Sequence, residues 1–214
     1  MIEERKYKIS ELSAVLGTKG KDNIEGKLQR YNIEYTVTGR GNDIVFDITA
    51  VNDKLKVFCI LDIGFPAQTD INKLENFLYF FLNVEGFITL PDEAKALFMA
   101  DNSRTLSRQT IANYIKRLIT ANLMYRSDKI IYYFIYKQER TPTDKETYNK
   151  AWRGYFADKA KGAEPSEAML NMLINYGGYA KKYIVPEQNA LELDRINYLN
   201  DLVLERIEQL YGKE

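Results

Sequence analysis

Amide, hydroxyl and basic side chains recur along one side of the segment from 107 to 121. At about 100° per residue, their spacing predicts a helix whose packed face carries Ile111, Ile115, Leu118 and Ile119. The opposite face carries Gln109, Thr110, Asn113, Lys116, Arg117 and Thr120. Such groups match the hydrogen-bonding atoms of base edges and the oxygens of phosphate. The pattern predicts a helix that contacts nucleic acid, with a plain solvent-exposed face and a protein-binding face as the alternatives.

Two short runs after this helix predict a β-hairpin. We expect strands over 123–126 and 130–137, because the second run is rich in β-branched and aromatic side chains, and residues 127–129 would form the turn between them. The window from 101 to 140 holds eight Lys or Arg residues and three Asp or Glu residues. A basic cluster beside a DNA duplex gains affinity mainly by displacing condensed counterions, so we expect binding that weakens as salt is added.

The overall composition excludes several classes of protein. The 214 residues are 45% hydrophobic and 28% charged with a formal net charge of zero, as in an ordinary globular protein. Histidine is absent, which excludes Ser-His-Asp and Cys-His catalysis and most zinc sites. Neither a phosphate-binding glycine loop nor a paired-carboxylate motif stands out. We therefore expect a protein without catalytic residues, metal ion or cofactor.

The sequence also predicts the cellular location of the protein. No apolar run approaches the roughly 18 residues that cross a bilayer, and the N-terminus lacks the apolar core of a signal peptide. We expect a cytoplasmic protein with no membrane partner. The single cysteine, Cys59, lies in the apolar run 57–63, so a buried structural thiol is expected.

The first 64 residues predict two helices followed by a hairpin. The expected helices cover 8–16 and a second stretch from Asp22 or Asn23, and the expected strands cover 34–38, 44–49 and 54–63. Lys27, Arg30 and Arg40 would project from this unit as DNA contacts. The charge of this unit is balanced and Gly26 weakens its second helix, so a unit used for protein contact is the alternative.

Helices are expected over most of the remaining chain. They begin at Ile71, cover 92–99 and lead to the 107–121 helix, and three more cover 145–161, 166–176 and 189–211. In the last helix, a seam of apolar residues repeats at three- and four-residue steps: Ile196, Leu199, Val203, Ile207 and Leu210. This seam could pack back on the second domain or pair with a second copy in a homodimer, and the sequence leaves both open.

The segment from 71 to 137 resembles the winged helix-turn-helix superfamily. LSRQTIANYIKRL stands in the place of the recognition helix and MYRSDKIIYYFIYK in the place of the wing. The segment from 8 to 50 resembles the same superfamily more faintly. In outline the chain is similar to plasmid and phage replication initiators and to regulators of mobile elements. The resemblance implies an α+β protein with two winged-helix-like units, 1–64 and 71–140, followed by a C-terminal helical region, 141–214.

The resemblance also implies roles for particular residues. In winged helices the third helix enters the major groove and the wing contacts phosphate or the minor groove. By this comparison Thr110, Asn113 and Arg117 would face bases. Contacts to phosphate would come from Arg108, Lys116, Arg126 and Lys129.

These patterns predict a sequence-specific double-stranded DNA-binding protein that regulates transcription or replication, acts as a homodimer and belongs to a phage or another mobile element. A repressor and a replication initiator are not separated by the sequence. The alternative is a non-catalytic protein-binding module, an inhibitor or adaptor, on the same scaffold. Zero net charge and the aromatic residues around Trp152 favour that alternative.

Overall fold

The structure is a computed structural model that describes residues 2–137 and 139–212, without the side chains of residues 42 and 211. Its described residues combine helices with small antiparallel sheets, which confirms the α+β class. Two compact units are formed: Met1–Val84, Thr110–Met124 and Gln188–Glu214 make unit 1, and Glu85–Gln109 and Tyr125–Glu187 make unit 2. Both units are assembled from separate stretches of the chain, unlike the consecutive segments expected from the sequence.

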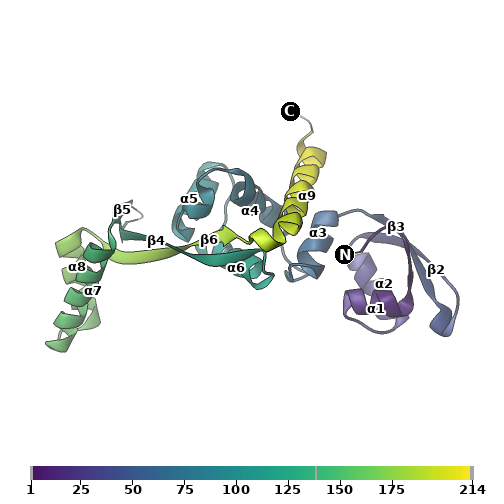
Figure 1. Ribbon diagram of the computed structural model, residues 1–214, viewed down its shortest axis with the longest axis horizontal. Helices are drawn as coiled ribbons and strands as arrows, with labels where there is room; N and C mark the ends of the chain where they lie inside the picture. Colours follow the sequence, from purple (N-terminus) through teal and green to yellow (C-terminus); the bar gives the residue numbers. More distant parts are fainter. Residues whose placement is uncertain (1, 138, 213–214) are drawn as a thin grey trace. The chain divides into compact units, whose positions relative to one another are not determined.

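The N-terminal part of unit 1 consists of two helices on a small sheet (Figure 1). Its elements are β1 (Lys6–Lys8), α1 (Ile9–Leu16), α2 (Lys21–Arg30), β2 (Ile33–Thr38) and β3 (Val45–Val51). The sheet order is β1-β3-β2, and Phe46 of β3 lies opposite both Tyr7 of β1 and Val37 of β2. Leu12 of α1, Ile24 of α2 and Phe46 share one buried core. The expected order of two helices and a hairpin is confirmed.

The segment expected as a strand over 54–63 is a helix, α3 (Lys54–Leu61). Asp53 caps this helix, because its carboxylate accepts a hydrogen bond from the backbone N–H of Lys56 at 3.0 Å. Residues 57–59, the last of which is the single cysteine, are all buried. The prediction of a strand was wrong because an unbroken apolar run is typical both of a buried strand and of a helix that is buried on most sides. The third strand of the sheet is β1 instead.

The helix expected over 107–121 is confirmed as α6 (Arg108–Thr120). It packs beside α4 (Ile71–Asn83) and the loop that follows α3. The ring of Tyr114 in α6 lies 5.4 Å from that of Phe77 in α4 and 5.6 Å from that of Phe65 in the loop, measured between centroids. Aromatic contacts at this spacing hold one side of α6 in the core of unit 1.

The last helix, α9 (Leu193–Tyr211), packs within the chain. It contacts α3 and α4, and Ile196, Leu199 and Val203 of the predicted seam are all buried. Of the two alternatives left open by the sequence, packing back on the same chain is the one that the structure shows. A homodimer through 189–211 would have to use the exposed side of this helix.

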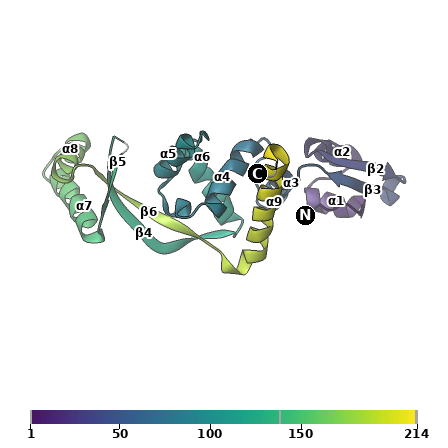
Figure 2. The same cartoon turned by 90° about the horizontal axis from the view of Figure 1, so that it is seen from above.

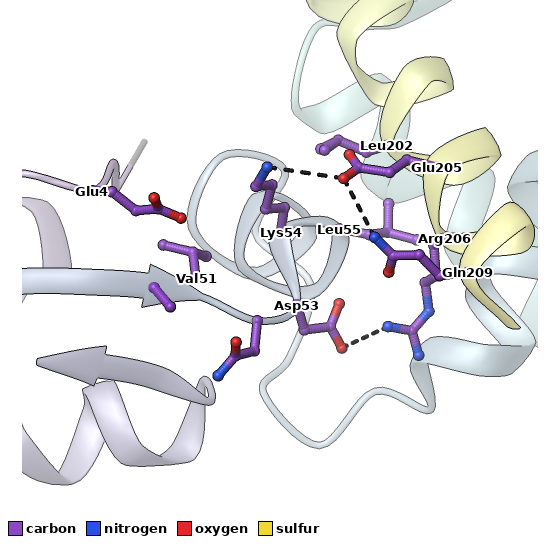
Figure 3. Close-up of a pocket in the computed structure, with 11 residues that line it drawn as sticks. Glu4, Val51, Asp53, Lys54, Leu55, Leu202, Glu205, Arg206 and Gln209 are labelled. Atoms are coloured by element: carbon purple, nitrogen blue, oxygen red, sulfur yellow. Dashed lines mark hydrogen bonds and ion pairs between the residues drawn. The ribbon is translucent and has the colours of Figure 1, made fainter.

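Arg206 of α9 ties the helices of unit 1 together through charge (Figure 3). Its guanidinium lies 2.8 Å from the carboxylate of Asp53, and its Nε lies 2.6 Å from the carboxylate of Glu75 in α4. The side chain of Glu75 is only 1% exposed and that of Arg206 is 19% exposed. Because these charges are largely removed from water, each depends on the other for compensation.

Unit 2 places a pair of helices beside a second sheet. Its elements are α5 (Asp92–Asp101), β4 (Met124–Tyr136), β5 (Glu139–Thr143), α7 (Lys145–Ala160), α8 (Pro165–Tyr176) and β6 (Tyr179–Gln188), after a short 3-10 helix at Phe87–Thr89. The strand order is β5-β4-β6, and α7 and α8 lie side by side (Figures 1 and 2). Phe134, Ala151 and Met172 form their shared core. The helical region expected over 141–214 is therefore wrong in part, because β5 and β6 interrupt it.

The hairpin expected over 123–137 is also wrong, because these residues run through one long strand, β4. Ser127 was expected in the turn, yet it is buried and its Oγ donates a hydrogen bond to the carbonyl of Val185 at 2.8 Å. Val185 belongs to β6, so the partner that keeps β4 extended comes from far along the chain. Local turn signals do not reveal such a partner.

Replacing Arg206 with Met should lower the free energy of unfolding by about 3–5 kcal/mol, because the buried carboxylate of Glu75 loses its ion pair. Urea unfolding followed by circular dichroism measures this loss. Lys54→Ala is the matched control, since it breaks the exposed Lys54–Glu205 pair and should cost less than about 1 kcal/mol. Equal losses in the two variants would contradict the role given to Arg206.

Candidate functional site

The candidate site is the exposed side of α6. Ile111, Tyr114, Ile115 and Leu118 are buried, and the spacing of these residues turns the other side of the helix outward. Gln109, Asn113, Lys116, Arg117 and Thr120 are exposed, and Thr110 is half-buried. The sidedness predicted from the sequence is confirmed, because three of the four residues expected to pack are buried, Ile119 is half-buried, and all six polar residues lie on the outer side.

A hollow of about 450 Å³ opens along this face. One side is the loop after α3, with Phe65, Pro66 and Thr69, and the other side is α6. The residues of α6 that line it are Thr110, Asn113, Tyr114, Lys116, Arg117 and Thr120. The ring of Phe65 meets that of Tyr114 nearly edge-on, at an interplanar angle of 80°. The structure therefore brings four of the predicted site residues together around one concave surface.

The lining of this hollow, which we call the α6 hollow, is positively charged. Lys116 and Arg117 line it, and no Asp or Glu does so among the residues that the structure describes. Within the same residues, neither cation has a side-chain hydrogen bond or ion pair. Burial raises the pKa of the Tyr114 phenol, and the charge of Asp70 raises it further, so this hydroxyl stays neutral near pH 7.

Three of the predicted phosphate contacts lie in unit 2, and two of them form ion pairs within the chain. Arg108 pairs with Glu93 of α5 at 2.9 Å, and Lys129 of β4 pairs with Glu187 of β6 at 2.7 Å. The hydrogen bond to Glu187 raises the pKa of Lys129. Arg126 is exposed on β4.

The predicted contacts of the N-terminal part are distributed over α2 and the β2–β3 connection. The ammonium group of Lys27 donates a hydrogen bond to the carbonyl of Leu16 at 2.6 Å and so closes the end of α1. Arg30 is exposed at the end of α2, and Arg40 is exposed beside the turn at Gly41–Asp43. Lys27 therefore has a structural role, whereas Arg30 and Arg40 face solvent.

The sequence did not point to Phe65, Pro66, Thr69 or Tyr114. The run from 64 to 70 reads as a linker because it contains Gly, Pro and polar residues. Tyr114 lies on the packed side of α6, where an aromatic residue is read as core. A large aromatic residue inside a short polar loop was the one available signal, because such a side chain must pack against something.

Comparison with known proteins gives no match to a family model, to a curated protein or to a solved structure. In the described part of the chain, no helix is both long enough and apolar enough to span a bilayer. The same residues contain no group of three or more potential metal ligands close enough to hold an ion.

A second hollow, of about 280 Å³, lies between the start of α3 and α9 (Figure 3). Four of its five charged residues are paired, because Lys54 pairs with Glu205 at 3.9 Å and Arg206 pairs with Asp53 at 2.8 Å, and Glu4 is the fifth. Gln209 donates a hydrogen bond to Glu205. These pairs hold α9 against the start of α3, and the lining holds one more carboxylate than cations, which does not suit an anionic ligand.

Unit 2 contains a buried lysine that the sequence analysis missed. Lys95 of α5 is 0% exposed, and its ammonium donates hydrogen bonds to the carbonyl of Ile88 at 3.0 Å, to the carbonyl of Leu90 and to the hydroxyl of Tyr183 at 2.8 Å. Burial lowers the pKa of Lys95 to about 7, against the opposing effect of Asp92. Lys95 thus fixes the 88–90 loop to α5 and β6.

The free energy of unfolding should rise with pH between 7 and 8; nearer pH 9 the Cys59 thiol opposes the rise, because burial raises its pKa and it ionises only when unfolded. The folded protein releases the Lys95 proton near pH 7, whereas an unfolded lysine keeps it to above pH 10. The unfolded state then binds more protons than the folded state, and stability gains up to roughly 1 kcal/mol per pH unit. Urea unfolding at several pH values measures this slope. A Lys95→Met variant should lose this rise, and an unchanged slope in that variant would refute the assignment.

Proposed function

We propose that the protein binds double-stranded DNA in a sequence-specific manner, as a regulator of transcription or replication, and that α6 is the helix that reads the groove. One observation carries the proposal. On the outer side of α6, Lys116 and Arg117 form no ion pair or side-chain hydrogen bond with any residue that the structure describes. These cations sit on a helix whose inner side is packed. A rigid helix that presents cations beside amide groups suits entry into a major groove.

The residues divide by the contacts that each could make. Gln109 and Asn113 carry amides, which pair with adenine, and Arg117 carries a guanidinium, which pairs with guanine. Lys116 is a point charge suited to phosphate. Arg108 and Lys129 would have to leave Glu93 and Glu187 before they could bind phosphate. We therefore assign them a smaller share of the affinity than the sequence suggested.

A winged-helix arrangement is part of the proposal for the N-terminal part of unit 1. The order β1-α1-α2-β2-β3 places a hairpin after two helices, as expected from the faint resemblance of 8–50. In such an arrangement α2 would lie near DNA and Arg40 would lie near the tip of the wing. Arg30 and Arg40, both exposed, would supply auxiliary phosphate contacts.

The double variant Asn113→Ala, Arg117→Ala should bind DNA at least about tenfold more weakly than the parent, because it removes one amide and one guanidinium from α6. Fluorescence anisotropy with labelled duplex of random sequence, at roughly 50 and 200 mM salt, measures this loss. The parent should bind at the lower salt and weaken steeply at the higher.

The matched control is the double variant Arg153→Ala, Asn175→Ala, which removes the same two residue types from exposed positions on α7 and α8. It should bind as the parent does. Parental affinity in the α6 variant, with its helix content intact by circular dichroism, would rule out the assignment.

A second candidate function is a non-catalytic protein-binding module, an inhibitor or adaptor. Large apolar side chains on α7 and α8 favour it, because Phe156 is 61% exposed, Leu170 is 52% exposed and Ile174 is 70% exposed. Heparin chromatography separates the two candidates. A DNA-binding protein should be retained and elute with salt, whereas a protein-binding module should flow through.

A further inference from the structure

We infer that the α6 hollow takes a single nucleotide, with the base inside the hollow and the phosphate against Lys116 and Arg117. The inference rests on the proposed function, since it names what one part of the α6 face holds. It goes beyond groove reading because a nucleotide inside a hollow must be unstacked from its neighbours. The source is either an unstacked nucleotide of a nucleic acid or a free mononucleotide.

The size and lining of the hollow suit a base. Its volume of about 450 Å³ falls within the range of roughly 300–1,000 Å³ that is usual for small-molecule sites. Pro66 is exposed and supplies apolar surface for a flat ring, and the largely buried rings of Phe65 and Tyr114 lie beside it in the lining. Thr69, Thr110 and Asn113 carry hydroxyl and amide groups, which donate and accept hydrogen bonds as the edge of a base requires.

The charge of the hollow suits a phosphate. Lys116 and Arg117 are consecutive on the outer side of α6 and both line the hollow. Guanidinium and ammonium groups form strong hydrogen bonds to phosphate oxygens. No described carboxylate lines the hollow to repel the anion, and the neutral phenol of Tyr114 adds no negative charge. The hollow beside α9 differs on this point, because its cations are already paired with Asp53 and Glu205.

Apolar surface and cations in one hollow require a ligand that carries both a ring and an anion. A nucleotide satisfies this requirement, whereas a nucleoside lacks the anion and a sugar phosphate lacks the ring. The two fragments therefore serve as probes that dissect the site. Each should bind at least about tenfold more weakly than the whole nucleotide, because each leaves one half of the hollow unused.

The first experiment titrates the protein with deoxynucleoside 5′-monophosphates and follows amide chemical shifts by NMR. The matching deoxynucleosides and deoxyribose 5-phosphate are titrated in parallel. The inference predicts shifts in residues 65–69 and 110–120, with the nucleotide binding most tightly. Deoxyribose 5-phosphate that binds as tightly as every nucleotide would overturn it, because the base would then contribute nothing.

The second experiment compares a plain DNA duplex with the same duplex carrying one unpaired, bulged nucleotide, by fluorescence anisotropy. A bulged nucleotide leaves the stack at low cost, so a nucleic-acid source predicts at least a fivefold preference for the bulged duplex. A free-mononucleotide source predicts binding in the first experiment with no such preference. If mononucleotides do not bind and no preference exists, the inference is wrong.

Filling the hollow provides the decisive variant. Thr69→Trp places an indole in the space of the base, at a half-buried position in the 65–69 loop. It should abolish nucleotide binding and any preference for the bulge. Thr18→Trp, at another half-buried loop position of unit 1, is the matched control and should leave both intact. Undiminished binding in a folded Thr69→Trp variant would overturn the inference.

The outcomes also separate this inference from the proposed function. Suppose that the parent does not bind nucleotides and that the Thr69→Trp variant still binds plain duplex. The nucleotide site is then rejected, whereas the proposal that α6 reads DNA is kept. Loss of duplex binding in the Asn113→Ala, Arg117→Ala variant tests the α6 face itself. Nucleotide binding by a protein that fails to bind plain duplex would support the hollow and reject the groove assignment.

Discussion

The buried charge network around Arg206 is the interaction on which unit 1 depends. One guanidinium compensates Asp53 at the start of α3 and Glu75 within α4. These three residues come from three helices, and α9 is supplied by the far end of the chain. Burying charges is costly unless each is paired, so the network favours one arrangement of α3, α4 and α9.

This arrangement determines what α6 can present. Because Tyr114 packs on Phe77 and Phe65, α6 has one possible inner side and its polar residues face outward. Arg195 of α9 adds a hydrogen bond to the carbonyl of Ala121, just after α6, at 3.3 Å. The α6 hollow is a consequence of the same packing, since the loop after α3 forms its other side. The proposed nucleic-acid surface is thus supported by the packing of α6 on α4 and the loop after α3, and by the hydrogen bond from α9.

The sequence predicted those elements whose signal is local. The polar and apolar sides of α6, the two N-terminal helices and the β2–β3 hairpin all follow from periodicity within a few residues. The errors arose where contacts between residues far apart in the sequence determine the local structure. β4 is extended because β6 pairs beside it, and α3 is helical although its apolar run also suits a strand. Lys95 is buried because two carbonyls and the Tyr183 hydroxyl accept hydrogen bonds from its ammonium group. Of the candidate site, the residues on α6 were predicted, whereas the side formed by Phe65, Pro66 and Thr69 was not.

Hydrogen–deuterium exchange of the whole protein, with and without duplex DNA of random sequence at low salt, tests the central claim most directly. The account predicts that DNA slows exchange in the exposed turns of α6, over residues 108–120, and in the 65–69 loop. It predicts no change in α7 and α8, which serve as an internal reference. Protection confined to other elements, with α6 unaffected while DNA is bound, would contradict the account.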